Sequence, residues 1–259
     1  MSQSDLQIIT MDAPYFTLRN NPLARELFGK VIGTRINSYL QDYGEGVFPL
    51  GEEDFLSELV LICKKDGETF EPIYSFKITS FETCQKFKIS FPLFSMLEKR
   101  YGHTAEYHKL ENFVKNKMEQ GKKLAYLGSR SKSVEVNWTK DMSSLLWGAG
   151  VCALVNSCEF FGIEEFVLFG MLNRQAYKYC EQMGMKNILP TKVIVDSLGQ
   201  SEAYILYKES FSPDFLEIAH RYSAMWENRI HISKDSSQTY QLSHLTHQGK
   251  CETHYKSHH

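Results

Sequence analysis

The chain has 259 residues, which is enough for one large domain with a hydrophobic core. Its 29 basic and 31 acidic residues nearly cancel, so charge gives no basis for binding nucleic acid or an acidic membrane surface. Aromatic residues make up 13% of the chain, which favours an aromatic core and is also compatible with an apolar pocket.

The six cysteines include no Cys-x-x-Cys pair, and we expect them to be reduced and mostly buried, as in a cytoplasmic protein. Residues 1–12 are polar and acidic and lack the basic start and apolar run of a signal peptide. The longest apolar run, 145–155, is far shorter than the roughly 20 residues that a transmembrane helix needs. The sequence therefore predicts a cytoplasmic protein with no metal site and no stable membrane insertion.

The N-terminal half has the pattern of a helix followed by a hairpin. Asn21-Pro22 supplies an N-cap and a first-turn proline, and Gly44 ends the apolar residues that recur at helical spacing. Lys65-Asp66-Gly67 is a turn signal between two strand-like runs. After a lead-in over 1–22 with strand-like patches at 6–10 and 15–18, we expect a helix over 22–43, strands over 58–64, 72–79 and 83–91, a helical turn over 94–101 and a helix over 103–119.

The C-terminal half alternates strands and helices. Residues 143–161 are apolar almost all round, which predicts a buried helix. Asn173 is a favoured N-cap and Gly184 a favoured helix stop. In chain order we expect an interrupted strand over 124–126 and 133–137 with a polar break at 128–131, the helix over 143–161, a strand over 164–172, a helix over 173–184, strands over 192–195 and 202–207, and a helix over 213–228.

This order of elements predicts a mixed α/β layer fold with its main domain over 23–210. Residues 1–22 precede that domain, and 211–233 add a C-terminal helix. The Ser-, His- and Gln-rich residues 234–259 are expected to form a disordered tail.

The segment that begins at Asn173 carries a specific spacing. Asn173, Ala176, Cys180 and Gly184, followed by Met185, resemble the last conserved block of the GNAT N-acyltransferase superfamily, Asn-x-x-Ala-x-x-x-Tyr-x-x-x-Gly-Phe. The resemblance implies a GNAT-like fold, with a central, mostly antiparallel sheet flanked by helices. It also implies that Cys180 stands where the family has the tyrosine thought to protonate the leaving thiolate.

A glycine pair in the buried helix is similar to the pyrophosphate loop of the same superfamily, Gln/Arg-x-x-Gly-x-Gly/Ala. Gly148 and Gly150 match that loop, while Leu145 replaces its first residue. A loop at the start of a helix offers unpaired N–H groups to phosphates, whereas the alternative is that small residues let a buried helix pack tightly. The donor-binding residues implied by the resemblance are Val136, Asn137, Ser144, Leu146, Trp147, Gly148, Ala149, Gly150, Asn173 and Ala176.

Within the superfamily, the chain looks most like the autoinducer (acyl-homoserine-lactone) synthases and N-acyl amino acid synthases. The similarity lies in a helix with an arginine, an acidic-aromatic element at 53–55, a hairpin, and a strand ending in Arg130. Here Leu127 replaces a family glutamate, and a lysine stands where an arginine is expected. The substrate-binding residues implied are Arg35, Phe55, Lys77 and Arg130.

Direct acyl transfer to an amine needs a deprotonated amine, a polarised thioester carbonyl and a proton for the leaving thiolate. Glu135, expected in mid-strand, is the candidate base acting through water, with a solvated carboxylate as the alternative. A strand N–H near Val136 or Asn137 would polarise the carbonyl.

The candidate proton donor is Cys180, whose unperturbed pKa would lie near about 8.5. The alternative for Cys180 is a small buried hydrophobic residue. Tyr179 and Tyr177 are the other candidate donors, although they lie on different faces of the expected helix.

The function implied is N-acyl transfer from acyl-CoA or an acyl carrier protein to an amine of a small molecule such as an amino acid derivative. Aromatic residues between 70 and 101 would wall an acyl-chain pocket. The competing hypothesis is a catalytically inactive GNAT-like binding or regulatory module, because Leu145, Leu127 and Cys180 all replace family residues. A third is a structural partner of another protein.

Overall fold

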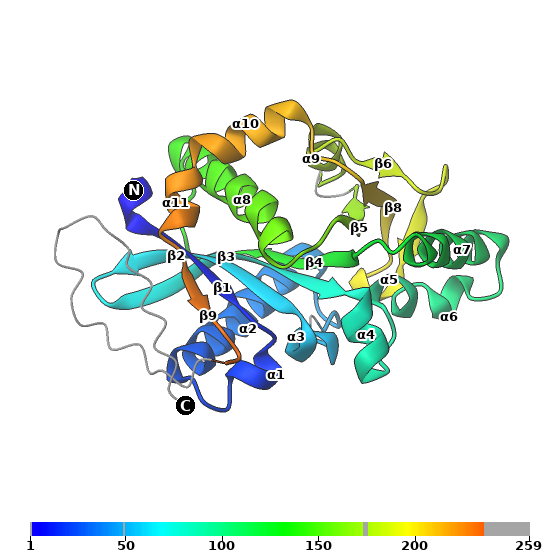
Figure 1. Cartoon of the computed structure of the whole chain (residues 1–259), viewed down its shortest axis with the longest axis horizontal. Helices are drawn as coiled ribbons and strands as arrows, with labels where there is room; N and C mark the ends of the chain where they lie inside the picture. The colour runs from blue at the N-terminus through cyan, green and yellow to red at the C-terminus, as the bar shows by residue number, and fades with distance from the viewer. Residues whose placement is uncertain (1, 49, 173–175, 236–259) are drawn as a thin grey trace.

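The computed structural model describes residues 2–48, 50–172 and 176–235. Within them, nine strands form one mixed sheet in the order β6-β8-β5-β4-β3-β2-β1-β9, with β7 paired to β8 (Figure 1). Neighbouring strands are antiparallel except for the pairs β1–β9 and β4–β5. Helices lie against both faces of the sheet. The predicted fold class, a mixed and mostly antiparallel sheet flanked by helices, is confirmed.

The first half of the described chain runs from the N-terminus to the longest helix on the lower face in Figure 1 and then through a hairpin. Its elements are η1 (Gln3–Asp5), β1 (Leu6–Met11), α1 (Pro14–Thr17), α2 (Pro22–Tyr43), α3 (Glu53–Leu56), β2 (Glu58–Asp66), β3 (Thr69–Ser80), α4 (Phe81–Phe87), α5 (Pro92–Ser95), α6 (Glu98–Tyr101) and α7 (Ala105–Glu119).

The second half begins at the centre of the sheet and returns to its edge beside the N-terminal strand. Its elements are β4 (Leu124–Lys132), α8 (Lys140–Phe160), β5 (Glu165–Met171), α9 (Ala176–Gln182), β6 (Lys186–Asn187), β7 (Val193–Val195), η2 (Asp196–Leu198), β8 (Ser201–Lys208), α10 (Pro213–Arg221), α11 (Ser223–Glu227) and β9 (Ile230–Ile232).

Helix α2 forms where the sequence predicts it. The Asn21 side chain accepts a hydrogen bond from the backbone N–H of Ala24 at 3.0 Å, and Pro22 occupies the first turn. Gly44 ends the helix with φ 79, a conformation that glycine adopts without steric cost. Local signals therefore set where α2 begins and ends, and the helix packs against β3 and β4.

The predicted lead-in is part of the sheet. Strand β1 pairs with β2 on one side and with β9 on the other, and Ile8, Ile9 and Met11 are fully buried. The patch predicted as strand at 15–18 is instead helical, because Pro14 occupies the first turn of α1.

Two other strand predictions are wrong. Residues 83–91 begin as helix α4, because the Ser80 side chain accepts from the backbone N–H of Thr83 and so caps a helix. Residues 133–137 are not a strand, whereas the polar stretch 128–131 continues β4 without interruption. Residues 128–131 line a cavity that is described below, which explains why they are polar. From the sequence alone, this polar stretch was predicted to interrupt the strand.

The C-terminal helical stretch is divided in two. Tyr222, with φ −110 and ψ 10, separates α10 from α11, where one helix over 213–228 was expected. The expected tail over 234–259 lies outside the described residues from 236 onward, as does the predicted N-cap Asn173.

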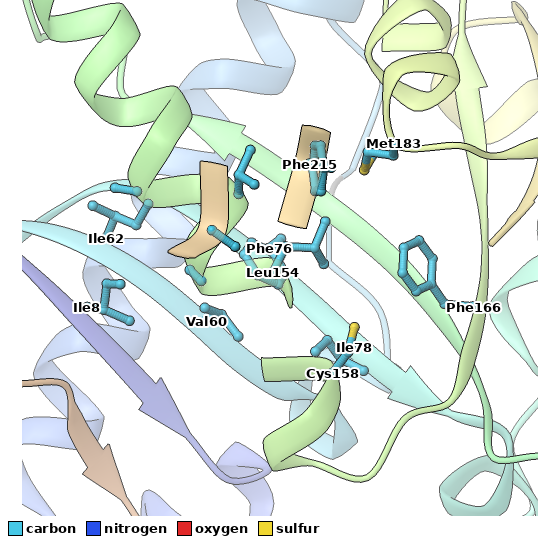
Figure 2. Close-up of a cluster of buried hydrophobic side chains, with 14 of the residues drawn as sticks. Ile8, Val60, Ile62, Phe76, Ile78, Leu154, Cys158, Phe166, Met183 and Phe215 are labelled. Atoms are coloured by element: carbon cyan, nitrogen blue, oxygen red, sulfur yellow. The ribbon is translucent and has the colours of Figure 1, made fainter. Parts of the chain in front are cut away.

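The largest core lies between the sheet and the layer of α8 and α10. Figure 2 shows Phe76, Leu154 and Phe215, from a strand and two helices, grouped in this core. Cys158 and Phe166 extend it toward the start of β5. A second core on the opposite face packs α4 to α7 against β4, β5 and β8. The sheet is thus buried on both faces around its central strands.

Candidate functional site

A cavity of about 410 Å³ lies where two central strands separate. Strands β4 and β5 pair in parallel over three residue pairs, ending with Tyr126 and Val167. Beyond that point β4 continues along β3, while β5 continues along β8. The carboxyl ends of the two parallel strands therefore diverge, which is a common place for a ligand site in α/β proteins.

The cavity is lined from both faces of the sheet. Leu146, Trp147 and Met183 belong to the α8 side, whereas Tyr43 and Phe169 belong to the α7 side. The opening between β4 and β5 joins the two sides into one space.

The wall formed by β4 is irregular. Ser75 pairs with Ser131 and Lys77 with Gly128. Between these two pairs, β4 therefore contains one residue more than β3. This is a β-bulge, and Ser129 within it has φ 50. Tyr39 of α2 lies near Ser129, whose side chain partly offsets the rise that burial causes in the pKa of the Tyr39 hydroxyl. A bulge interrupts ladder pairing, and here it does so at the cavity wall.

Two cations stand on the α8 side of the cavity. The guanidinium of Arg130 lies 5.6 Å from the ring centre of Tyr74 and 5.7 Å from that of Tyr179. Lys132 lies 3.8 Å from the ring centre of Trp138, and burial together with Arg130 lowers the pKa of its ammonium. Of the predicted substrate-binding residues, Arg130 is the one that lines this cavity.

Cys180 also lines the cavity and is buried. Burial raises the pKa of its thiol to about 12, although Arg130 acts in the opposite direction. The thiol therefore stays protonated at neutral pH and is a weak acid and a weak nucleophile. This environment agrees with the alternative stated from the sequence, in which Cys180 is a small buried hydrophobic residue. Tyr179 is 39% exposed, at the rim, where its ring packs 5.1 Å from that of Trp147.

The expected phosphate loop is not at a helix start. Helix α8 begins at Lys140, capped by Thr139, whose side chain accepts from the backbone N–H of Met142. A Cβ at Gly148 would lie 2.2 Å from ring atoms of Tyr222, so this glycine permits close packing of α8 against the residue between α10 and α11. A Cβ at Gly150 would instead lie 3.7 Å from Tyr74, beside the cavity.

The predicted donor-binding residues therefore divide into two groups. Leu146, Trp147, Gly150 and Ala176 line the cavity. Residues that do not line it are Val136, Asn137, Ser144, Gly148 and Ala149, and Asn173 lies outside the described residues.

Glu135 is not in a strand. It lies in an exposed bend between β4 and α8, where the Ser133 hydroxyl accepts a hydrogen bond from its backbone N–H at 3.3 Å. The strand that forms the cavity wall ends at Lys132, so Glu135, Val136 and Asn137 follow this strand instead of lying within it.

Arg35 and Lys77 are part of a buried ion cluster behind the cavity. Both contact the carboxylate of Asp54, Arg35 by a very short hydrogen bond and Lys77 at 2.9 Å, and Lys77 also contacts Glu53 at 3.0 Å. Burial raises the pKa of Asp54, but Lys77 and Arg35 more than offset this and hold it below its ordinary value. The fourth predicted substrate residue, Phe55, packs its ring 5.3 Å from Phe28. This cluster links α2 to α3 and β3, and its members do not line the cavity.

Sequence reasoning missed the α2 contribution to the cavity, which comes from Ser38, Tyr39, Asp42 and Tyr43. These polar positions follow Arg35 by three, four, seven and eight residues, on the face of a helix that covers a sheet. This polar stripe on the side of α2 that faces the sheet was the signal in the sequence that could have identified these cavity residues.

Among the described residues, no three histidine, cysteine, aspartate or glutamate side chains are grouped as a metal site would require. In the same part of the chain, every helix is too short or too polar to cross a bilayer.

Comparison of the sequence with protein-family models finds no match, and comparison with curated proteins finds none. Solved structures with a similar arrangement include FeeM, an N-acyl amino acid synthase from uncultured soil microbes, at 12% identity over 74% of this chain and 94% of that one, with a TM-score of 0.46.

Two further similar structures are acyl-homoserine lactone synthases. MesI, described as CoA-dependent, is 10% identical over 89% of this chain and 100% of its own, with a TM-score of 0.48. The AHL synthase LasI is 11% identical over 78% and 87%, with a TM-score of 0.47. Identities this low do not determine an activity, which must follow from the site itself.

Proposed function

We propose that this protein transfers an acyl group from a thioester donor, acyl-CoA or an acyl carrier protein, to the amine of a small molecule. The observation that supports this proposal is the cavity at the divergence of β4 and β5, which is lined by residues from both faces of the sheet. In the proposed reaction, RCO–SR′ and R″NH₃⁺ give RCO–NHR″, R′SH and a proton. The C–N bond forms as the C–S bond breaks.

The pantetheine arm of the donor would lie along the edge of β4. Pantetheine carries amide groups like those of a peptide, and an extended amide chain pairs with a strand edge. Between Leu127 and Lys132, β4 faces the cavity on the side where β5 has turned away. The arm is proposed to lie in that opening, with the thioester beside the bulge at Ser129, and a backbone N–H of the bulge would polarise the thioester carbonyl.

The phosphates of the donor would then lie near the start of α8. Arg130 and Lys132 supply positive charge on that side of the cavity, and Ser143 in the first turn of α8 lines the cavity. The first N–H groups of a helix favour anions. The same end of the cavity thus combines a helix start with two cations.

The proton for the leaving thiolate is proposed to come from water. A thiol with a pKa of about 12 holds its proton more tightly than a CoA-like thiol with a pKa of about 8.5, so Cys180 is a poor donor to such a thiolate. Its presence favours a second hypothesis, a module that binds the donor without turnover.

Thiol release separates these hypotheses. The protein would be incubated with acetyl-, hexanoyl-, decanoyl- and palmitoyl-CoA, each with a panel of amines, while CoA binding is followed by thermal shift. Amine-dependent thiol release supports transfer, and stabilisation by CoA without release supports the binding module. Absence of both overturns the proposal.

A matched pair of variants ties either result to the cavity. Gly150→Leu would place a side chain beside Tyr74 in the cavity, whereas Gly33→Leu adds one on exposed α2, where nothing lies within 4 Å. Gly150→Leu is expected to abolish binding and turnover, and Gly33→Leu to leave both unchanged.

A further inference from the structure

The cavity follows one face of α8, and its character changes along the helix. The α8 residues that line it recur at spacings of three and four, which form one stripe on a helix: Ser143, Leu146, Trp147, Gly150, Val151 and Leu154. Ser143 lies in the first turn, and Leu154 lies about 16 Å further along the helix axis. The stripe therefore begins at a polar residue and ends at an apolar one.

The two strands under α8 change in the same direction. At one end, Tyr74 of β3 pairs with Lys132 of β4, and the guanidinium of Arg130 lies 5.6 Å from the Tyr74 ring centre. At the other end, Ile78 pairs with Leu127, and both contribute to the core between the sheet and α8. The wall formed by β3 and β4 thus has a cationic end and an apolar end.

Helix and strands are aligned so that their like ends coincide. A Cβ at Gly150 would lie 3.7 Å from Tyr74, so the middle of the α8 stripe lies over this ring. Leu154, one turn later, belongs with Phe76 to the same buried core (Figure 2). Ser143 and the two cations of β4 therefore mark one end of the cavity, and Leu154 and Phe76 mark the other.

The apolar end is built from buried side chains of the sheet and of the helical layer above it. Figure 2 shows most of them, and the set that lines the cavity is Phe76, Leu154, Leu168, Met183 and Phe215. A space lined by carbon is poorly suited to water and binds apolar groups. Of the aromatic residues between 70 and 101 that were expected to wall an acyl-chain pocket, Tyr74 and Phe76 line this cavity.

The opposite side of the sheet suits a hydrocarbon less well. There the cavity is lined by side chains that carry hydroxyl groups, among them Ser38, Tyr39 and Tyr126. A hydrocarbon packed against hydroxyl groups displaces their water and offers no hydrogen bond in return. The space between Phe76 and Leu154 imposes no such cost.

We infer that the apolar end of the cavity binds the hydrocarbon chain of the donor, which makes the substrate class a medium- or long-chain fatty acyl thioester. This inference rests on the donor position given in the proposed function. With the phosphates at the cationic end and the thioester beside Ser129, the acyl chain continues along β4 past Leu127 toward Leu154. An acetyl group is too short to fill this end.

The first test measures binding without an amine, by isothermal titration calorimetry with CoA, acetyl-CoA, hexanoyl-CoA, decanoyl-CoA and decanoate. Each pair of buried methylenes should tighten binding about tenfold, so decanoyl-CoA should bind at least about 100-fold more tightly than acetyl-CoA. Equal Kd values for acetyl-CoA and decanoyl-CoA would overturn the inference. Decanoate that binds as tightly as decanoyl-CoA would also overturn it, because the site would then belong to a free lipid carboxylate.

Three variants that each introduce a phenylalanine locate the chain. Leu154→Phe and Leu168→Phe fill the apolar end from a helix and from a strand, whereas Met171→Phe adds the same side chain on the opposite side of the sheet. Each of the first two is expected to reduce the preference for decanoyl-CoA over acetyl-CoA about tenfold or more, and Met171→Phe to leave it unchanged. Urea unfolding of each variant confirms that it is folded, and the two filling variants check each other.

The outcomes separate this inference from the proposed function. A preference that falls in Met171→Phe but not in Leu154→Phe or Leu168→Phe would place the chain on the opposite side and overturn the inference. Amine-dependent thiol release from acetyl-CoA, with decanoyl-CoA bound no more tightly, would overturn the inference and leave acyl transfer intact. Graded binding without thiol release from any donor would support the acyl-chain site and overturn transfer.

Discussion

Tyr126 of β4 and Val167 of β5 are the last residues that pair between these two parallel strands. After them, Leu127 pairs with Ile78 of β3, and Leu168 pairs with Leu206 of β8. Each strand keeps a partner on its outer side, so the two can separate at the centre of the sheet without losing both ladders. The cavity, and with it every functional proposal above, depends on that separation.

Gly148 is predicted to be required for packing. Gly148→Ala should lower the free energy of unfolding by about 1–3 kcal/mol, because its Cβ would overlap the Tyr222 ring. Gly33→Ala, on an exposed part of α2 with no atom nearby, should instead raise it by about 0.5–1 kcal/mol. Urea unfolding measures both. Tyr222→Ala in the same chain should remove most of the Gly148→Ala penalty, and additive effects would contradict the contact.

Cys180 is predicted to line the cavity without acting as the proton donor. Loss of a general acid typically costs about 100-fold or more in kcat, whereas Cys180→Ala should cost less than about tenfold. The kcat of a transfer reaction, compared between Cys180→Ala and Cys180→Ser, measures the effect. Iodoacetamide should modify the thiol slowly at neutral pH, because burial raises its pKa to about 12. Rapid alkylation, or a loss of several hundredfold, would assign the residue a chemical role.

Asp54 is predicted to be essential for stability. Asp54→Asn removes the carboxylate that the buried Arg35 and Lys77 share, while Lys77 keeps its contact with Glu53, and this loss should cost about 3–5 kcal/mol. Glu71→Gln, at the exposed pair with Lys30, should cost less than about 1 kcal/mol.

The effect of Asp54 should also depend on pH. Because the folded pKa of Asp54 is lowered, its contribution is fully present above the unfolded pKa of about 3.9 and is lost as pH falls through the folded value. The difference between Asp54→Asn and the unaltered protein, measured by urea unfolding at decreasing pH, should shrink only below about pH 4. A constant difference down to lower pH would contradict the ion pairs.

Glu58 is predicted to weaken the fold at high pH. Burial raises the pKa of its carboxyl to about 7, with a smaller contribution from Asp12, and its Oε2 has no hydrogen-bond partner among the described residues. The unfolded chain loses this proton near about pH 4.3, so stability falls as pH rises from there to about 7. Glu58→Gln should be more stable than the unaltered protein by about 1–3 kcal/mol at pH 8 and similar to it at pH 4. Equal differences at both pH values would contradict the shift.

Local signals in the sequence predicted the elements that are set by local chemistry. Asn21-Pro22 and Gly44 bound α2 as expected, and the Lys65-Asp66-Gly67 turn joins β2 to β3. The strand at 164–172 and the stop at Gly184, whose φ is 89, also agree. Each of these depends on residues within a few positions of one another, so periodicity and capping were sufficient.

The errors occurred where a partner distant in sequence decides the structure. The polar run 128–131 was predicted as a break, but β3 pairs with it and its bulge fits a cavity wall. Gly148 resembles a phosphate-binding glycine in sequence, yet a ring some seventy residues later occupies the space beside it. Residues 83–91 alternate like a strand, but the Ser80 cap begins a helix there.

By itself the sequence determined the bounds of α2, the β2–β3 hairpin, the mixed α/β class and the resemblance around Asn173 to Met185, because these follow from spacing along the chain. Only the tertiary structure decided which residues share the cavity. Asp42 and Arg130 are far apart in sequence and lie on opposite faces of the sheet, and they line one space because β4 and β5 part after Tyr126 and Val167. That separation depends on the outer partners of both strands, which no local pattern encodes.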